Sequence, residues 1–546
     1  MLSYRKLAMR VLGRPFHTGG SDSPRPASQR AAAFILTAAM LITLSAPAFA
    51  GTWCIDEGNI TVKAGDTKGK NTVSQGNKKD VEDTNTIITG TSDKNTVTID
   101  TSKGNVDVTF DDLNIDASSR KEAAMSVTGS GNTTIKLDGD NHLTGGNGSS
   151  GIDSIGSLTI YGGENDSLTA KGGSGADGSG GDGIHSGSLT IYGGTVNANG
   201  GNCGDGNYSD GGSGISSNGS LTVSGGTVTA NGGNGGSGGG NGGDGITSNG
   251  GVTISSGSTV TANGGRGEDG SGGSGISNGG SLTVSDGTVT AKGGNGDSKD
   301  GYGGDGIRSG GGVTISGNTV NAAGGYGGKV GGYGICSFDR VGVAISGGTV
   351  EAAGGNGSTG GGSGIYSSVI DLSGSLELTA KAGSPNGKAL SQRGYELDLD
   401  TIKDKLGPGA KVTATDANGE TKQVSTPRPV EPEESSSSSD GGSATPSAPA
   451  SPLPGLTVTD KDGQRISYTS TQSGNTLTVC VGRLTASFRI SLAALRQLRA
   501  EGIETIAFQT VLCSTTLSVD ELLAMGGENA EAVLTHRFTD SSLTVG

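Results

Sequence analysis

The most regular part of this chain reads Gly214-Ile215-Ser-Ser-Asn-Gly-Ser-Leu221-Thr-Val-Ser-Gly-Gly-Thr227-Val-Thr-Ala230-Asn-Gly-Gly. A glycine-rich run follows, and Gly245-Ile246 then opens the next copy. The isoleucine of the Gly-Ile pair recurs at positions 152, 184, 215, 246, 276, 307, 335 and 365, with a spacing of 28 to 32 residues. A fixed period of this size indicates a solenoid, an array or a propeller.

The pattern inside the unit predicts strands. Leu221 to Ser224 alternates apolar and polar residues, and Thr227 to Ala230 does the same. Period two is typical of a strand with one buried face, and the Gly225-Gly226 pair between the two runs predicts a turn. Together with the short Gly-Ile segment, each unit supplies three strands, which make one turn of a three-sided coil.

Stacking of these coils gives the predicted fold. One coil cannot bury its own apolar row, so copies must pair with copies, about 4.8 Å apart. We therefore predict an all-β chain with a right-handed parallel β-helix, the hand following the preference of parallel crossovers. A propeller is the weaker alternative, since each blade needs a fourth strand and usually more aromatic residues. The inward ladder is predicted to contain Leu158, Leu189, Leu221, Val252, Leu282 and Val313.

The first fifty residues read as an export signal. Basic residues from Arg5 to Arg30 precede the apolar run 31–44, and Ala48-Phe49-Ala50 forms a small–x–small cleavage pattern. This predicts a mature chain that starts at Gly51 and is secreted or cell-wall associated. A retained membrane anchor is the alternative, but the apolar run is short for a membrane span.

The rest of the chain divides by composition. We expect an irregular β-rich cap with the first coils at 51–150, the repeat β-helix at 151–405, a Pro/Ser-rich disordered linker at 406–455 and a small α+β domain at 456–546. In the last domain the sequence predicts strands at 477–481 and 503–508, a helix from Ser491 to Gly502, and a second helix that opens with the capping box Ser518–Glu521.

Composition excludes some functions. Glycine supplies 108 of 546 residues and aromatic residues only 3%, which suits a thin solenoid core of aliphatic side chains. A net charge of −15 argues against a nucleic-acid partner. The five cysteines show no zinc-ligand spacing. Cys480 and Cys513 share a domain and form a candidate disulfide, with packing as free thiols the alternative.

Several segments resemble a known group of proteins. Thr134-Ile-Lys-Leu-Asp-Gly-Asp-Asn-His-Leu, Ser157-Leu-Thr-Ile-Tyr-Gly-Gly and the repeated Gly-Asp-Gly-Ile are similar to exported β-helix proteins of Gram-positive anaerobes, described as carbohydrate-binding-domain-containing or adhesin-like surface proteins. The resemblance covers about residues 100 to 380. It implies calcium-assisted binding of polysaccharide without cleavage, and for calcium ligands it carries over only to aspartate positions.

One aspartate position repeats from coil to coil. Gly-Asp-Gly-Ile occurs at Asp182, Asp244 and Asp305, and Gly-Ser-Gly-Ile occurs in copies between them. These carboxylates, about 9.6 Å apart, are candidate Ca²⁺ ligands together with backbone carbonyls and the loop residues Asp177 and Asp269. The alternative is that they only close turns by bonding their own backbone. The nearby glycine runs match only part of a calcium-binding nonapeptide, so we expect flexible surface loops there.

Outward-facing residues form the candidate carbohydrate site. Thr159 and Thr190 belong to an outward threonine ladder, and Tyr161 and Tyr192 follow two residues later on adjacent coils. Aromatic faces beside hydroxyl groups suit sugar rings, while a stabilising cross-strand stack is the alternative. Threonine rows also occur in ice-binding surfaces, but Asn197, Asn321 and Glu351 interrupt them here. Loop tyrosines extend the candidate surface: Tyr208, Tyr302, Tyr326, Tyr333 and Tyr366.

No set of residues predicts catalysis. His185 and Arg308 each follow Gly-Asp-Gly-Ile, but they lie four coils apart, about 19 Å at the strand spacing. A lyase or hydrolase needs a base or paired carboxylates at one centre. The sequence thus predicts a non-catalytic carbohydrate-binding or adhesin-like protein, with calcium as the candidate ion that assists binding. A structural stalk presenting the C-terminal domain is the main alternative, and a polysaccharide lyase or hydrolase the remote one.

Overall fold

The computed structural model describes residues 51–427 and 455–545, except for 67–68, 177, 205–207, 461–463, 467, 474, 482–484, 511–513, 526–529 and 538–539. The predicted signal peptide, Asp177, Cys513 and the central part of the predicted linker lie outside the described residues. Within those ranges, no helix has both the length and the apolar character needed to cross a bilayer.

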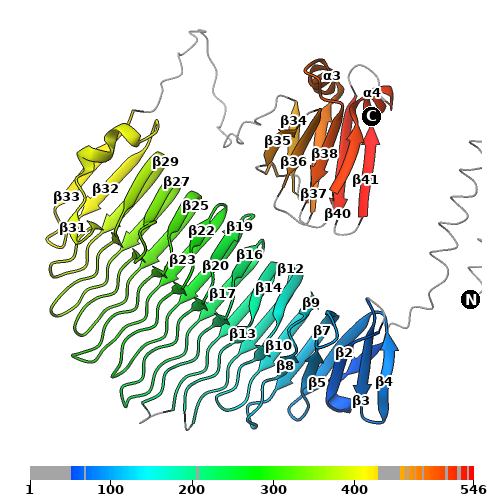
Figure 1. Cartoon of the computed structure of the whole chain (residues 1–546), viewed down its shortest axis with the longest axis horizontal. Helices are drawn as coiled ribbons and strands as arrows, with labels where there is room; N and C mark the ends of the chain where they lie inside the picture. Colours follow the sequence, from blue (N-terminus) through cyan, green and yellow to red (C-terminus); the bar gives the residue numbers. More distant parts are fainter. Residues whose placement is uncertain are drawn as a thin grey trace, which may run out of the picture. The chain divides into compact units, whose positions relative to one another are not determined.

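Residues 51–425 form a parallel β-helix, drawn from blue to yellow in Figure 1. Its wider wall is an 18-stranded sheet, called the wide sheet below. The strands of this sheet are β1 (Thr52–Cys54), β5 (Thr86–Ser92), β7 (Val106–Asp116), β9 (Asn132–Asp138), β10 (Asp140–Thr144), β12 (Ser157–Lys171), β14 (Ser188–Asn199), β16 (Leu221–Ser224), β17 (Thr227–Asn231), β19 (Val252–Ser255), β20 (Ser258–Asn263), β22 (Leu282–Val284), β23 (Gly287–Lys292), β25 (Val313–Ala323), β27 (Val343–Ala353), β29 (Ile370–Lys381), β32 (Lys411–Thr415) and β33 (Thr421–Ser425).

The opposite wall is a 15-stranded sheet of shorter strands, called the narrow sheet below. These are β2 (Ile60–Ala64), β3 (Asn71–Gln75), β4 (Lys78–Asp83), β6 (Val97–Asp100), β8 (Met125–Thr128), β11 (Ile152–Ser154), β13 (Ile184–Ser186), β15 (Ile215–Ser217), β18 (Ile246–Ser248), β21 (Ile276–Asn278), β24 (Ile307–Ser309), β26 (Ile335–Ser337), β28 (Ile365–Ser367), β30 (Leu390–Gln392) and β31 (Tyr395–Glu396). Each Gly-Ile segment of the repeat therefore forms one strand of this sheet.

The three predicted strand segments are confirmed, but two of them share one wall. β16 and β17 both belong to the 18-stranded sheet, and in β14 the corresponding segments run on as a single strand. The inward ladder is also confirmed, since Leu189 pairs with Leu221, Leu221 with Val252 and Val252 with Leu282. All of these side chains are buried. The apolar residues of successive copies thus form one continuous core.

The glycine tracts complete the coil as a tightly packed layer. Gly212 N donates to Gly201 O (2.9 Å), Gly233 N to Gly212 O (2.8 Å) and Gly243 N to Gly233 O (2.8 Å). A Cβ atom built on Gly233 would lie 2.0 Å from Gly201 O, so only glycine lets these backbones approach so closely. The expectation of flexible surface loops is wrong for these tracts, because their N–H groups are bonded between successive segments.

Antiparallel hairpins cover both ends of the helix. At the N-terminal end β2 pairs with β3, and β3 with β4, beyond the last parallel strand of the narrow sheet. At the other end β32 pairs with β33, beside the 3-10 helix η2 (Leu399–Lys405). Because β32 pairs in parallel with β29, the solenoid continues past residue 405, where the sequence placed its end, and stops at Ser425.

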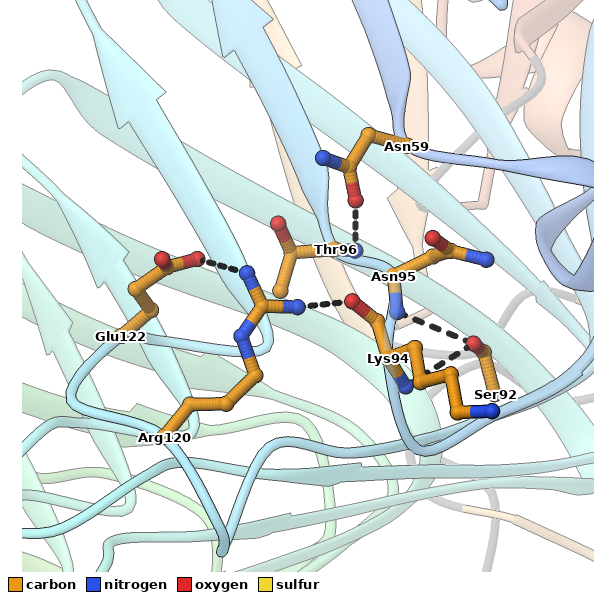
Figure 2. A network of polar contacts seen from close by, with 7 residues as sticks. All are labelled: Asn59, Ser92, Lys94, Asn95, Thr96, Arg120 and Glu122. Carbon is orange, nitrogen blue, oxygen red and sulfur yellow. Dashed lines mark hydrogen bonds and ion pairs between the residues drawn. The ribbon is translucent and has the colours of Figure 1, made fainter. Parts of the chain in front are cut away.

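Polar side chains hold the turn between β5 and β6 (Figure 2). Asn59 Oδ1 accepts from Thr96 N (2.9 Å), and Ser92 Oγ accepts from Asn95 N (3.0 Å). Arg120 lies on the following coil. It donates to the carbonyl of Lys94 in the turn and to Glu122 Oε2, two residues further along its own coil. The turn is thereby bonded to the segment after the 3-10 helix η1 (Ile55–Glu57) on one side and to the following coil on the other.

The C-terminal domain has its own core and is α+β, as predicted. Its strands and helices are β34 (Leu456–Thr459), β35 (Thr469–Ser473), β36 (Thr476–Cys480), β37 (Thr485–Ser491), α3 (Leu492–Ala500), β38 (Thr505–Gln509), β39 (Ser514–Ser518), α4 (Val519–Met525), β40 (Glu531–Arg537) and β41 (Asp540–Val545). Ser491 caps α3 by accepting from Ala494 N (3.2 Å), and Ser518 accepts from Glu521 N (3.4 Å). Cys480 is a free thiol.

Candidate functional site

The aspartates of the Gly-Asp-Gly-Ile corners bond the backbone of the next coil. Asp182 Oδ1 accepts from Ser213 N (2.7 Å), and Asp244 Oδ1 accepts from Ser274 N (2.6 Å). Asp305 Oδ1 accepts from Tyr333 N (2.7 Å). In each case the donor occupies the same place in the following copy. The carboxylate therefore supplies an acceptor to an N–H group next to the glycine layer.

Asparagines perform the same task at other places of the repeat. Their Oδ1 atoms accept the backbone N–H of the matching residue one coil on, in the pairs Asn147–Ala176, Asn202–Asn234, Asn234–Arg266, Asn295–Tyr326 and Asn356–Ser384. Amide and carboxylate oxygens are thus interchangeable in this role. This supports a structural role for the aspartates, but the bond runs to the next coil, whereas the turn-closing alternative predicts a bond within their own turn.

Burial acts on these carboxylates electrostatically. Removal from water raises the pKa of Asp244 to about 6, although the hydrogen bond from Ser274 opposes the shift. Burial also raises the pKa of Asp182 and that of Asp305, again against the bond from the next coil. Burial therefore disfavours the ionised form at each of these corners.

The structure does not gather the candidate calcium ligands into one cluster. In the described ranges, no group of three or more His, Cys, Asp or Glu side chains is arranged to hold a metal ion. Asp269 is exposed in its loop, and Asp177 lies outside the described residues. One oxygen of each corner aspartate is already engaged by a backbone donor. Calcium at these corners stays a prediction.

Tyr161 and Tyr192 stack on the outside of the wide sheet. They are register partners on β12 and β14, and their ring centroids lie 4.9 Å apart with a 17° angle between the planes. Partial burial raises the pKa of the Tyr161 phenol. The predicted cross-strand stack is therefore present, and each ring keeps one face and its outer edge clear of the other.

The predicted threonines flank this pair. Thr159 pairs with Thr190 in the same register, and Thr159 Oγ1 donates to Asn132 Oδ1 (3.2 Å) on the preceding coil. On the following coil the chain carries Ser224, directly after the register partner of Ile191. The free face of Tyr192 thus lies towards small polar side chains.

A second aromatic cluster lies on the narrow sheet. Tyr333 and Tyr366 stack with ring centroids 4.8 Å apart, and Phe338 lies 6.1 Å from the Tyr366 ring. Phe338 is 51% exposed, and the Arg308 guanidinium lies over its ring at 4.8 Å. The exposed ring of Phe338 and the guanidinium of Arg308 thus lie together at the surface as a cation–π pair.

Beneath this cluster lies a buried polar pair. Cys336 Sγ donates to Asp305 Oδ2 (3.3 Å), and Arg308 reaches the same oxygen at 3.5 Å. Burial raises the pKa of the Cys336 thiol well above its ordinary value, so the group stays a neutral thiol. The Arg308 side chain remains 53% exposed and keeps donors free for an outside anion.

Sequence reasoning missed Phe338, although the repeat contained its signal. The residue after Ile-x-Ser is glycine or asparagine at 187, 218, 249 and 310, and only this copy replaces it with an aromatic residue. Ile155 and Ser368 also depart from glycine or asparagine at this place, so Phe338 is distinguished by being aromatic.

His185 joins three successive coils on the narrow sheet. Its Nδ1 lies 2.8 Å from Asp153 Oδ1, and Asn218 Nδ2 lies 3.0 Å from its Nε2. The bond to Asp153 raises the pKa of His185. Both ring nitrogens are engaged, so in this arrangement the imidazole has no free nitrogen to offer a substrate. His185 and Arg308 lie four coils apart in the ladder, as predicted.

Comparison with known proteins adds no relative: no family model, no curated protein and no solved structure matches the chain.

Proposed function

We propose that the solenoid is a non-catalytic carbohydrate-binding, adhesin-like protein that acts outside the cell. The observation that carries the proposal is the stacked pair Tyr161–Tyr192 on an outward face. Aromatic residues make up only 3% of the chain, and the solenoid core uses mostly Ile, Leu, Val and Ala. Rings that the core does not need are thus concentrated where a ligand can reach them.

The geometry suits a sugar ring lying across the pair. The C–H faces of a pyranose pack on aromatic rings, and its hydroxyl groups need nearby donors and acceptors. Thr159 and Thr190 supply hydroxyls beside the rings. Because coils repeat at about 4.8 Å, an extended glycan can follow the helix axis across several coils.

The second cluster suits an acidic sugar. Tyr333, Tyr366 and Phe338 provide apolar surface, and Arg308 provides an exposed guanidinium. A planar guanidinium binds a carboxylate through two parallel hydrogen bonds. A polysaccharide that contains uronate units would therefore engage this cluster more strongly than a neutral one.

Retention on glycan arrays and insoluble polysaccharides tests the proposal, using the chain from Gly51 to Gly546. The variant Tyr161→Ala/Tyr192→Ala should lose about tenfold or more in affinity for its glycan, because the ring surface is removed. Tyr395→Ala is the matched control, since Tyr395 is 78% exposed and lies outside both clusters. Melting curves of all proteins check that the loss is not caused by unfolding.

Two results would contradict the proposal. The wild-type protein would be retained on no polysaccharide or host glycan, or the double variant would bind as well as the wild type. Release of reducing ends or unsaturated products from a polymer would instead indicate an enzyme.

A stalk that presents the C-terminal domain is the second candidate, because residues 456–545 have a separate hydrophobic core. Deletion of residues 456–546 distinguishes the two. A glycan-binding solenoid keeps its affinity after the deletion, whereas a stalk loses all binding.

A further inference from the structure

Asp83 is a buried carboxylate at the end of β4, with only 1% of its surface exposed. Its Oδ1 accepts from Gly51 N (3.0 Å) and Asn85 N (3.1 Å), and its Oδ2 accepts from Trp53 Nε1 (2.8 Å). Among the residues that the structure describes, no basic side chain pairs with it. The charge of this buried carboxylate is balanced by hydrogen bonds alone, so a cation placed beside it would reduce the cost of its burial.

Gly51 is the residue that the sequence predicts as the first of the mature chain. Hydrolysis of the Ala50–Gly51 bond adds water, leaves a carboxylate on Ala50 and converts the Gly51 amide nitrogen to an α-ammonium group. That nitrogen already lies within hydrogen-bond distance of Asp83. A Cβ atom on residue 51 would lie 2.5 Å from Trp53 Nε1 and 2.6 Å from Asp83 Oδ2, so the position has no room for a side chain.

We propose that removal of residues 1–50 completes the N-terminal cap by pairing the new α-ammonium of Gly51 with the buried carboxylate of Asp83. The proposal rests on the predicted cleavage and is independent of glycan binding. In the precursor the same nitrogen is a neutral amide, which donates one hydrogen bond and carries no charge. Processing therefore supplies the missing cation.

The effect extends beyond the first residue. β1 pairs in parallel with β5, and Asn95 Nδ2 donates to Ile55 O (2.8 Å) just after β1. Gln75 of β3 donates to the Cys54 carbonyl. Fixing Gly51 thus orders the segment that carries β1, an end strand of the wide sheet, where an unpaired strand edge would otherwise invite association.

Charged groups lie on the segments that adjoin the pair. Lys78 Nζ lies 5.4 Å from the centre of the Trp53 ring, and Cys54 and Asp56 lie on the segment that follows. An α-amino group that gains a carboxylate partner has a raised folded-state pKa. Its stabilisation is present below the unfolded value of about 8 and is lost as the pH rises through the folded value.

A double-mutant cycle with amide hydrogen exchange tests the proposal. One protein starts at Gly51, the other keeps Phe49 and Ala50, and each is made with Asp83 and with Asp83→Asn. The two-residue extension should speed exchange at residues 52–64 by about tenfold or more, because the buried pair is lost. In the Asp83→Asn background both N-termini should exchange alike. Asp93→Asn, an exposed carboxylate of the same region, should preserve the difference.

The decisive outcomes are separable. Equal exchange for the two N-termini, or a difference that persists in Asp83→Asn, overturns the ion pair. N-terminal sequencing of the exported protein should give Gly-Thr-Trp, and any other first residue overturns the coupling to processing. As the pH rises above about 8 and through the folded-state pKa, protection should fall only in the protein that starts at Gly51, since the extended chain also contains Lys78 and Cys54 but carries its α-amino group on Phe49, two residues away from the pair.

Discussion

At the scale of single residues, one chemical task recurs along the solenoid. A backbone N–H beside the glycine layer needs an acceptor, and an Asp or Asn from the preceding coil provides it, as in the pairs Asp244–Ser274 and Asn234–Arg266. Asparagine does this without charge. Aspartate does it at an electrostatic cost, because burial disfavours its ionised form.

That cost predicts the effect of pH. The folded-state pKa of Asp244, about 6, lies above the unfolded value of about 3.9, so the folded protein binds this proton more tightly than the unfolded chain does. Stability from this group is therefore present at low pH and is lost as the pH rises between these two values. Asp244→Asn keeps the acceptor for Ser274 and should stabilise the solenoid at pH 7 by on the order of 2 kcal/mol.

Urea denaturation at pH 5 and pH 7 measures this effect. The wild type should gain stability on acidification, and Asp244→Asn should gain less. Asp269→Asn, at an exposed position, is the control and should behave like the wild type. A destabilised Asp244→Asn at pH 7 would contradict the argument.

The same variant tests calcium. A metal ion held by Asp244 would raise the melting temperature of the wild type, and chelator would remove that gain in the wild type alone. A carboxylate that only accepts the backbone N–H gives no response to calcium or chelator. We expect the second result at this corner, because the backbone donor already engages one carboxylate oxygen.

His185 gives a pH response of the same sign, at a higher pH. Its pKa is raised by Asp153, so this contact adds stability that is full below about pH 6.5 and is lost as the pH rises through the folded value. Asp153→Asn should lower the pKa of His185. Proton NMR titration measures it directly, because the mature chain holds only His142, His185 and His536. An unchanged pKa would contradict the assignment.

At the scale of elements, the glycine tract is the least familiar part of the coil. Its backbones approach one another more closely than any side chain allows, and their N–H and C=O groups bond across the layer. The tract therefore forms a hydrogen-bonded layer of the solenoid. Its composition resembles a flexible linker, but its hydrogen bonds do not.

A Gly→Ala substitution should change stability much more inside this glycine layer than outside it. A Cβ on Gly265 would lie 1.9 Å from Gly233 O, whereas a Cβ on Gly178 would meet nothing within 4 Å. Gly265→Ala should destabilise the solenoid by about 2 kcal/mol or more, since packed backbone must move. Gly178→Ala should change stability by less than about 0.5 kcal/mol. Equal melting temperatures would show that the layer yields easily.

At the scale of the whole molecule, a solenoid must protect its two ends. The narrow sheet ends in β2, β3 and β4, and the wide sheet ends in the β32–β33 hairpin. At each of these ends the outermost strand runs antiparallel to its neighbour. The edge that it presents therefore differs from the edge of a parallel coil. Unprotected edges of parallel coils would pair with other molecules.

Removal of one cap should therefore cause association. Deletion of residues 416–425 removes β33 and exposes the edge of β32. We expect size-exclusion chromatography with light scattering to show a larger molecular mass for the deletion protein than for the intact chain, because exposed strand edges pair between molecules. An equal deletion at 436–445, which removes no strand that the structure describes, is the control. A deletion protein that elutes like this control would contradict the role of the hairpin.

The sequence alone determined the path of the chain through the repeat. Its period placed Leu221 beside Val252 and Thr159 beside Thr190, because parallel coils in register make equal sequence places into neighbours in space. Tertiary structure alone decided what the glycine tracts and polar corners do. The acceptor of each glycine N–H, and the donor to each corner aspartate, belongs to a different segment, and the choice depends on how closely backbones without side chains can pack. The pairing of Gly51 with Asp83 is of the same kind, since no repeat relates the two residues and only the folded cap brings them together.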